Sequence, residues 1–567
     1  MTEMTRRDAI ERLRRRPEIS VLVVGAGING AGVFRELALH DVDALLIDRG
    51  DYSCGTSAGP SRMVHAGLRY LEYGEYDLVR ESVHERNLLL QNAPHYILPL
   101  PTTIPLRSRW GGLGAWLRRR LGLGGGKRAP RRGAWLVKLG LRLYDRYAEP
   151  NRQMPTHRFA SRAEVFRRRP GLHPATVKTA TYYDAWVTYP ERLCMELILD
   201  AEAMSETCRS LNYVSLQGAD GETVTLRDEL TDEEVQVKPK AVVNATGAWI
   251  DGTNRRLAHE SELIAGTKGA HLILDNDDLV KACDGEQLLY ETDDGRVCLV
   301  YAWLGKAMIG STDIRVDDPD EARCDDDEID YMIGAVANVF PEIQIDRSQV
   351  LSCFTGVRPL KASSAQTTGA MSRSHLCHVS EANEAARFPV YSMVGGKWTP
   401  FRAFGEQAMD RLLEQLGMER KGNTESLAIG GGKGYPRTDE ARRAWVDRVS
   451  VATGLDVDRV ETLLWRYGTR GEQVAEFCAA GDRPLAGHET YTAREVEFIL
   501  RNERVCHLDD LLLRRTAVAL LGELNAALLE ELLAKFGEVH GWPAEKLAAE
   551  RERTIEILRD RHRVEIA

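Results

Sequence analysis

Three glycines and an acid near the start of the chain have the types and spacing of a dinucleotide-binding site. Gly25, Gly27 and Gly30 form a G-x-G-x-x-G pattern, and Asp48 follows eighteen positions after the last glycine. In this pattern the first glycine makes a tight turn, the second lets backbone approach a pyrophosphate, and the third lets a helix lie close to a strand. An acid at this distance suits the two hydroxyls of an adenosine ribose. The pattern predicts a bound dinucleotide without choosing between FAD and NAD.

The sequence around these residues predicts two strands and a helix that would position them. Val21–Val24 is an apolar, β-branched run that predicts a buried parallel strand, and Ala44–Ile47 predicts a second one. Residues 28–40 have helical spacing, so the positive end of that helix would face the diphosphate. Strand, glycines, helix, strand and acid therefore occur in the order that the site requires.

The next segment favours FAD over NAD. Residues 53–61 are small and rich in hydroxyls, where an NAD-only domain would continue with another plain strand and helix. Directly behind them His65, Arg69 and Tyr70 place an imidazole, a guanidinium and a phenol within six positions. We expect the hydroxyls to contact the diphosphate or the flavin edge.

Further cations occur at strand ends marked by glycine. Arg358 lies at a glycine–proline corner, Arg373 in the turn into another strand, and Lys397 directly after Gly395 and Gly396. A helix is predicted to follow Lys397, and its dipole together with the lysine would stabilise negative charge on a reduced flavin. His271 lies in a predicted strand after a glycine-flanked turn. A lone cation or histidine is more often an ordinary surface group. We single these residues out because they lie at strand ends marked by glycine.

Composition limits the classes of function. The chain has 567 residues, a net charge of −10 and ten scattered cysteines with no C-x-x-C pair. The acidic balance argues against nucleic acid as a partner, and the cysteine pattern predicts reduced thiols, with no metal site. No apolar run reaches the roughly 20 residues of a spanning helix, and the N-terminus lacks a secretory signal. We expect a cytoplasmic protein or one bound peripherally to the cytoplasmic face of the membrane.

One segment departs from this acidic balance. Residues 107–147 contain twelve Lys or Arg and one acid, Asp145, with leucines and tryptophans interleaved. Apolar and aromatic groups beside cations are typical of an interfacial helix on anionic lipid. The alternative is a solvated loop, since the glycine-rich residues 122–133 resemble a flexible link. We favour contact with a membrane surface.

Several motifs together resemble FAD-dependent glycerol-3-phosphate dehydrogenases, which are membrane-associated respiratory enzymes. The motifs occur in family order over most of the chain: GINGAG, GTS, HAGLRYLEYGEYDLVRE, NAPH, VVNATGAWID, GTKGAHLIL, IGSTD, FTGVRPL, VGGKWTPFRAFGE and LLLRRTAVALL. The resemblance implies oxidation of glycerol 3-phosphate at C2 to dihydroxyacetone phosphate, with hydride passing to FAD and electrons passing on to quinone.

The resemblance also implies roles for single residues. The substrate-contacting positions are Arg69, Tyr70, His271, Arg358, Arg373 and Lys397. Of these, we expect Arg358 and Arg373 to hold the phosphate with help from Tyr70, because a guanidinium offers a bidentate fork. His271 is the first choice for the base and His65 the second, while Arg69 polarises the developing carbonyl. The expected cofactor-binding positions are Gly25, Gly27, Ile28, Asn29, Gly30, Asp48, Arg49, Thr56, Ser57, Ser61, His65, Gly67, Gly247, Gly395, Gly396, Lys397, Trp398 and Thr399.

The predicted fold is α/β, with a discontinuous FAD domain of the two-dinucleotide-fold type, an antiparallel substrate-binding sheet and a C-terminal helical domain. The FAD domain is expected in residues 1–105, 176–262 and 353–422, the basic insertion in 106–175, the sheet in 263–352 and the helices in 423–567. The helical domain is interpreted as a docking or dimer-forming cap, so a homodimer is a possible state.

Two other functions stay open at this point. One is a flavin oxidase, or a relative acting on another small hydroxy or amino substrate. The other is a non-catalytic nucleotide-binding protein that docks through the basic segment.

Overall fold

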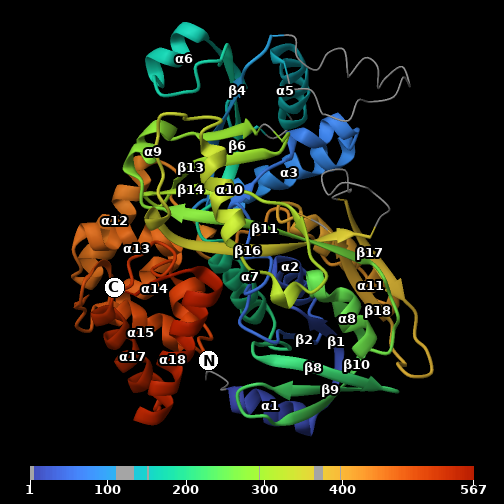
Figure 1. Ribbon diagram of the computed structural model, residues 1–567. Helices are drawn as coiled ribbons and strands as arrows, with labels where there is room; N and C mark the ends of the chain where they lie inside the picture. The colour runs from blue at the N-terminus through green and yellow to red at the C-terminus, as the bar shows by residue number, and fades with distance from the viewer. Residues whose placement is uncertain are drawn as a thin grey trace.

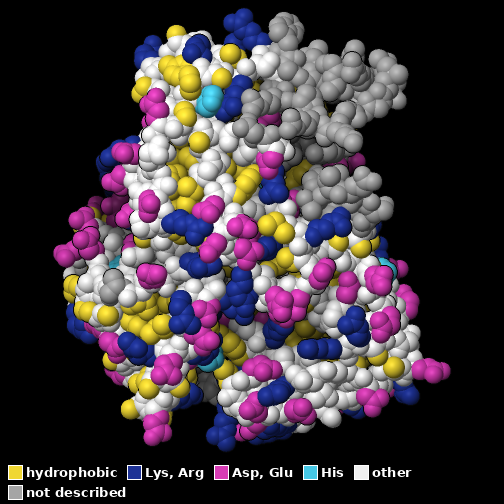
Figure 2. All heavy atoms as spheres, in the orientation of Figure 1, with side chains coloured by type: hydrophobic (Ala, Val, Ile, Leu, Met, Phe, Trp, Pro, Cys, Tyr) yellow, Lys and Arg dark blue, Asp and Glu magenta, His cyan; other side chains and the backbone are white. Residues whose placement is uncertain are grey.

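The computed structural model describes residues 6–109, 133–149, 152–292, 294–362, 374–395 and 397–566. Two sheets face each other, and the C-terminal helices pack beside both (Figure 1). On the face drawn in Figure 2, Lys and Arg side chains are interspersed with Asp and Glu. The net negative charge therefore forms no single acidic patch on that face.

The first sheet contains the predicted dinucleotide-binding unit. Its eight strands are β1 (Glu18–Val24), β2 (Ala44–Ile47), β7 (Cys208–Leu211), β8 (Val214–Asp220), β9 (Thr223–Asp228), β10 (Glu234–Asn244), β17 (His375–Ser380) and β18 (Val390–Gly395). The main path runs β17-β18-β10-β1-β2-β7, and all its pairs except β17–β18 are parallel. Parallel strands end at one edge, so the loops after β1, β2, β10 and β18 meet there.

Alternating side chains of β1 bury both faces of this sheet. Val21 and Val23 pack toward helices α2 (Ile28–Leu39), α7 (Pro190–Met204) and α11 (Phe401–Leu416). Leu22 and Val24 pack on the other face, against α1 (Arg6–Arg15) and the β8–β9 meander. The strand is buried on both sides, which explains its continuous apolar run.

The second sheet covers the carboxyl edge of the first. Its ten strands are β3 (Met63–Val64), β4 (Ile97–Leu106), β5 (Arg158–Ser161), β6 (Lys178–Val187), β11 (Ile264–Leu274), β12 (Gln287–Glu291), β13 (Val297–Trp303), β14 (Lys306–Gly310), β15 (Ile314–Arg315) and β16 (Val350–Lys361). The helices around it are α3 (Tyr76–Asn92), α5 (Ala134–Ala148), α6 (Arg162–Arg168), α9 (Asp277–Cys283) and α10 (Asp326–Val336), whereas α8 (Ile250–Arg256) packs on β8, β10 and β18 of the first sheet. Among the described helices, none is both long and apolar enough to cross a bilayer.

The alternation of β11 decides which of its side chains reach the first domain. Ala270 and Leu272 pack with α9 and α10, whereas Ile273 packs in the core that the sheet shares with the cofactor-binding domain. Successive side chains of a strand point to opposite faces. His271 therefore shares the face of Ile273.

The C-terminal part is helical, as predicted. Its elements are α12 (Asp439–Thr453), α13 (Val457–Tyr467), α14 (Gly471–Cys478), α15 (Ala493–Asn502), α16 (Leu508–Asp510), α17 (Ala526–His540) and α18 (Ala544–His562), with a small hairpin of β19 (Pro484–Leu485) and β20 (His488–Thr492). The apolar periodicity of residues 508–536 predicts one continuous helix, but this is wrong, because the chain leaves helical geometry at Thr516 and resumes it only at Ala526. Gly522 has a φ of +70°, and Asn525 caps the new helix through its side chain.

Two other expectations need correction. The antiparallel sheet is larger than residues 263–352, since β4 and β6, expected in the cofactor-binding domain, pair with each other inside it, and β16 crosses the predicted boundary. The alternating pattern of residues 235–240 and the continuous apolar pattern of residues 241–244 predict two separate strands, but they form the single strand β10. Its first half pairs with the meander and its second half with β1.

Candidate active site

A large cavity lies between the two sheets, at the carboxyl edge of the parallel strands. Its volume is about 1530 Å³, and its walls come from the loops after β1, β2, β10 and β18 and from β11 and β16. A site for one small molecule or cofactor usually has about 300–1,000 Å³. The cavity therefore has room for more than one ligand.

The glycine-rich turn needs its glycines for packing. Gly25 has a φ of +101°, and a Cβ there would lie 2.8 Å from the backbone of Ala245. A Cβ at Gly30 would lie 1.8 Å from the carbonyl oxygen of Gly25. Gly25 and Gly27 line the cavity, but Gly30 does not, so its part is to bring α2 close to β1.

Asp48 is fixed beside this turn by two backbone amides. Its Oδ2 accepts a hydrogen bond from the N–H of Ala26 at 2.7 Å, and its Oδ1 accepts one from Gly50 at 3.0 Å. Burial raises the pKa of the carboxyl to about 6, although the two amides act in the opposite direction. Each oxygen keeps a lone pair for a ribose hydroxyl.

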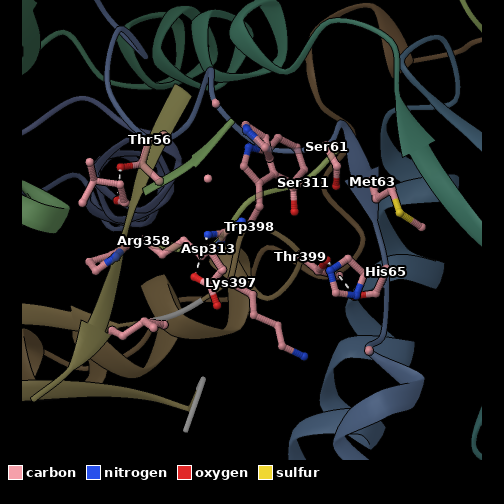
Figure 3. A pocket seen from close by; sticks show the side chains of 18 of the residues that line it. Thr56, Ser61, Met63, His65, Ser311, Asp313, Arg358, Lys397, Trp398 and Thr399 are labelled. Atoms are coloured by element: carbon pink, nitrogen blue, oxygen red, sulfur yellow. Dashed lines mark hydrogen bonds and ion pairs between the residues drawn. The ribbon is translucent and has the colours of Figure 1, made fainter. Parts of the chain in front are cut away.

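The hydroxyl-rich segment bonds both to the start of α2 and to strand β16. Ser57 Oγ accepts the N–H of Ile28 at 2.9 Å, at the start of α2, and Thr56 donates to the carbonyl oxygen of Val357 at 2.6 Å. Thr399 donates to the carbonyl oxygen of His65 at 3.1 Å, which ties the chain just after the segment to the loop after β18. Figure 3 shows Thr56, His65 and Thr399 at the cavity.

His271 is the most unusual titratable group in the cavity wall. Its side chain is buried, its ring stacks on Phe354 with centroids 5.2 Å apart, and neither ring nitrogen has a hydrogen-bond partner among the described residues. Burial, with the cations Arg358 and Arg62 nearby, lowers its pKa to about 3. The imidazole is therefore neutral at physiological pH and can accept a proton from a ligand.

Arg358 lies beside His271 on strand β16. It forms an ion pair with Asp313 at 3.1 Å and donates to the carbonyl oxygen of Thr312 at 3.3 Å (Figure 3). Gly269 makes room for it, because a Cβ at that position would lie 2.1 Å from the guanidinium. Asp313 was not singled out from the sequence, although it ends the IGSTD motif directly after β14.

Lys397 and Tyr70 meet in the cavity wall. The lysine Nζ lies 3.8 Å from the centroid of the Tyr70 ring and 3.4 Å from Ser82 Oγ. Gly67 has a φ of +76°, and a Cβ there would overlap the tyrosine ring. The glycine of the HAGLRY motif thus allows the tyrosine to fold back onto the cavity wall.

The other predicted residues fall into two groups. The remaining described ones line the cavity: Ile28, Asn29, Arg49, Ser61, Gly247, Gly395 and Trp398. Arg49 also reaches across to the second sheet's domain, where it pairs with Asp320 and lies 4.9 Å from the Trp249 ring. Arg373, Gly396 and the side chain of Arg69 lie outside the described residues.

The residues present fit a bound FAD. Buried polar atoms without a partner among the described residues include Asn29 Oδ1, Thr355 Oγ1 and Trp398 Nε1, and all three residues line the cavity. Buried polar groups are nearly always paired in a complete site. Together with the glycine turn and Asp48, these atoms mark out partners for a large polar ligand. No group of three or more potential metal ligands occurs in the part of the chain that the structure describes.

Comparison with known proteins agrees with this geometry. A family model described as FAD dependent oxidoreductase matches residues 20–385, and one described as the C-terminal domain of alpha-glycerophosphate oxidase matches residues 422–547. The chain is 31% identical to a glycerol-3-phosphate dehydrogenase of Synechocystis, over 94% of this chain and 96% of the relative. The chain belongs to the glycerol-3-phosphate dehydrogenase family of FAD-dependent oxidoreductases.

Two further members extend the comparison within and around this family. A D-erythritol 1-phosphate dehydrogenase of Brucella abortus is 30% identical over 88% of this chain and 93% of its own. The structure of a glycerol-3-phosphate dehydrogenase from Bacillus halodurans in complex with FAD superimposes with a TM-score of 0.74, at 20% identity, over 99% of this chain and 98% of that one. The predicted fold class and the FAD cofactor are confirmed.

Proposed function

We propose that this FAD-dependent enzyme oxidises sn-glycerol 3-phosphate to dihydroxyacetone phosphate. The observation that carries the proposal is the buried, neutral His271, whose unpartnered ring nitrogens lie beside Arg358 in a cavity that fits FAD. A base that takes a hydroxyl proton must be uncharged, and a small phosphorylated substrate needs a fixed cation nearby. Its relative in Synechocystis is named for this activity.

Each residue has a separate task in this proposal. His271 takes the proton of the C2 hydroxyl, and Arg358 binds the phosphate while Asp313 fixes the direction of its guanidinium. Tyr70 adds a hydrogen bond to the phosphate. Lys397 supplies positive charge beside the flavin ring. FAD, when bound, supplies the two-electron acceptor for the hydride from C2.

We prefer His271 to His65 as the base on geometric grounds. Thr399 holds the backbone of His65, not its ring, and the ring has interactions of its own. His271 lines the cavity, and both of its ring nitrogens have no partner among the described residues. Arg69 and Arg373 keep their predicted roles in carbonyl polarisation and phosphate binding, and we propose both for these positions.

A second phosphorylated polyol is a competing substrate. The D-erythritol 1-phosphate dehydrogenase of Brucella abortus is nearly as similar to this chain as the Synechocystis relative. The cavity also exceeds the volume of one cofactor site. A four-carbon chain would keep the phosphate at Arg358 and extend away from it.

We further propose quinone as the electron acceptor and a peripheral position on the cytoplasmic face of the membrane. The part of the cavity wall formed by α5 and its neighbours includes Leu68, Leu71, Ile104, Leu136, Leu139 and Leu289, together with the cations Arg107, Arg142 and Arg146. The apolar part of this wall suits a quinone ring and its isoprenoid chain better than a hydrated acceptor. α5 also exposes Trp135 and Leu139 beside Lys138 and Arg142. Such a surface favours anionic lipid.

The experiment is anaerobic addition of substrate to the yellow holoenzyme. We expect sn-glycerol 3-phosphate to bleach the flavin absorbance fully, and D-erythritol 1-phosphate to do so only at much higher concentration. A short-chain quinone admitted next should restore the colour faster than dissolved oxygen. The Arg358→Ala variant should need more substrate for the same bleaching while keeping its flavin.

Three results would contradict parts of the proposal. Faster bleaching by the four-carbon phosphate would reassign the substrate, and faster reoxidation by oxygen would make the enzyme an oxidase. A colourless protein that still binds the phosphates would indicate the non-catalytic alternative.

A further inference from the structure

The loop that follows β2 wraps around the glycine-rich turn. We call residues 48–57 the cofactor loop. Asp48 accepts the N–H of Ala26, Ser53 donates its N–H to the carbonyl oxygen of Ala26 at 3.0 Å, and Ser57 accepts the N–H of Ile28. The shape of the turn and the shape of the cofactor loop are thus fixed together.

One residue of the cofactor loop is held from the C-terminal domain. Asp51 is fully buried, and both of its oxygens are engaged by Arg515, whose Nη1 and Nη2 each lie 2.8 Å away. Arg514 adds a bond from Nε at 2.6 Å. These arginines follow Asp51 by more than 460 positions in the chain.

The two arginines are themselves fixed within the C-terminal domain. Arg514 donates to Asp509 at 2.7 Å and to Asp510 at 2.6 Å, and Arg515 Nε donates to the carbonyl oxygen of Glu503 at 2.9 Å. The segment that carries them leaves helical geometry at Thr516. The break in the predicted long helix is therefore the place where the domain presents both guanidinium groups to the cofactor loop.

The buried carboxylate of Asp51 needs the two arginines of the C-terminal domain to compensate its charge. A carboxylate buried without a partner is strongly unfavourable, and a bidentate guanidinium is the arrangement that compensates it best. Within the described residues, the other side chain bonded to Asp51 is the neutral Asn212, at 3.1 Å. Without the arginines Asp51 would have to turn toward water, and the cofactor loop would have to leave the glycine turn.

We propose that Arg515, supported by Arg514, is a positioning residue for FAD. It neutralises Asp51 and so holds the cofactor loop in the conformation that binds the adenosine diphosphate half of the cofactor. Through this contact with Asp51, the C-terminal domain is coupled energetically to the cofactor site. This role depends on FAD binding and is independent of which polyol phosphate is oxidised.

The test compares two equally conservative changes in the same domain. Arg515→Lys keeps the charge but loses the bidentate contact. Arg466→Lys is the matched control, because Arg466 is also buried and donates to the buried Glu495 at 2.6 Å, on α13. Each holoenzyme is diluted, and the release of FAD is followed by the return of its fluorescence. We expect release from the Arg515→Lys protein to be about tenfold faster or more, and release from the control to match the unmodified enzyme.

Hydrogen exchange on the same holoenzymes separates positioning from general destabilisation. Amides 50–54 should exchange faster in the Arg515→Lys protein and stay protected in the control, even where the two proteins melt at similar temperatures. Equal FAD release and equal protection in both variants would overturn the proposal. Should Arg515→Lys fail to yield soluble protein, Asp51→Asn removes the same contact from the loop side and carries the same expectation.

Discussion

At the scale of single residues, the distinctive feature is a histidine that the fold keeps neutral. His271 lies on a strand face that is buried against the cofactor-binding domain, next to two guanidinium groups. A buried imidazole beside cations is hard to protonate. These surroundings keep the ring neutral but weaken it as a base, so its part in proton transfer depends on the anion of a bound substrate offsetting the two cations.

Replacing His271 by Asn should lower kcat by about 10²–10⁴-fold, the usual contribution of a positioned general base. The flavin content should stay near that of the unmodified enzyme, because the side chain makes no hydrogen bond to another described residue. Steady-state kinetics and the flavin absorbance of the purified protein measure both quantities. Activity above one tenth of normal would remove His271 from the role of base.

The same variant carries an expectation for stability against pH. The pKa of His271 is about 3 in the folded chain, against a usual value near 6.5. Between these values the unfolded chain binds a proton that the folded chain does not, so the free energy of unfolding falls as pH falls. The Asn variant should show a smaller loss between pH 6.5 and pH 4 in denaturant titrations. An unchanged slope would mean that other groups dominate this range.

At the scale of elements, strand β11 positions both sides of the substrate site. It carries His271 on one face and uses Gly269, two residues earlier on the same face, to admit the Arg358 side chain of β16. The spacing of two is the period of a strand. The arrangement of substrate contacts from β11 and β16 therefore depends on residue 269 having no side chain.

Gly269→Ala should act on the substrate through Arg358. The new methyl group would displace the guanidinium, so KM should rise by about tenfold or more, as expected for a misplaced phosphate cation, with smaller change in kcat. Gly334→Ala on α10 is the control, because a Cβ there meets nothing within 4 Å. Substrate titrations of both variants test this. A normal KM in the Gly269→Ala protein would show that Arg358 can move without loss of substrate binding.

Much of this arrangement could be predicted from the sequence, and the reasons are local. Gly25, Gly27 and Asp48 lie within one strand–helix–strand unit, so their joint position follows from periodicity and spacing. The placement of His271 needed the family resemblance, because a lone histidine on a strand carries no such signal.

Other features could not be predicted because they depend on contacts between distant segments. The pairing of Arg358 with Asp313 joins β16 to the connection between β14 and β15, and Asp51 meets arginines from the far end of the chain. β4 and β6 looked like parts of the cofactor-binding domain, because strand pairing is decided by tertiary packing and not by a strand's own pattern. The helix break after Arg515 could not be predicted either, because the apolar run predicts a continuous helix and the break depends on the contact of Arg515 with Asp51.

At the scale of the whole molecule, helix α5 contributes both to the cavity wall and to the outer surface. Leu136 and Leu139 line the cavity, while Trp135 is 51% exposed and Lys138 lies 5.6 Å from its ring. A membrane bound to this surface would bring the acyl region close to these two leucines. Binding to the membrane would then also bring the enzyme its quinone acceptor.

The double variant Trp135→Ala, Lys138→Glu should bind vesicles of phosphatidylcholine and phosphatidylglycerol at least about tenfold more weakly, since each cation near an anionic leaflet contributes on the order of 1 kcal/mol. Neither residue lines the cavity, so bleaching by substrate should be unchanged. Trp465→Ala, at another exposed tryptophan on α13, is the control. Sedimentation with vesicles measures the binding. Equal sedimentation of all three proteins would exclude α5 as the contact.

The cavity wall takes residues from Val24, at the end of β1, to Arg561, on α18. During synthesis the early strands leave the ribosome long before α18 does, and domains generally fold as they emerge. A nascent chain can therefore assemble its glycine turn first, and the wall of the cavity is completed only when α18 has joined it.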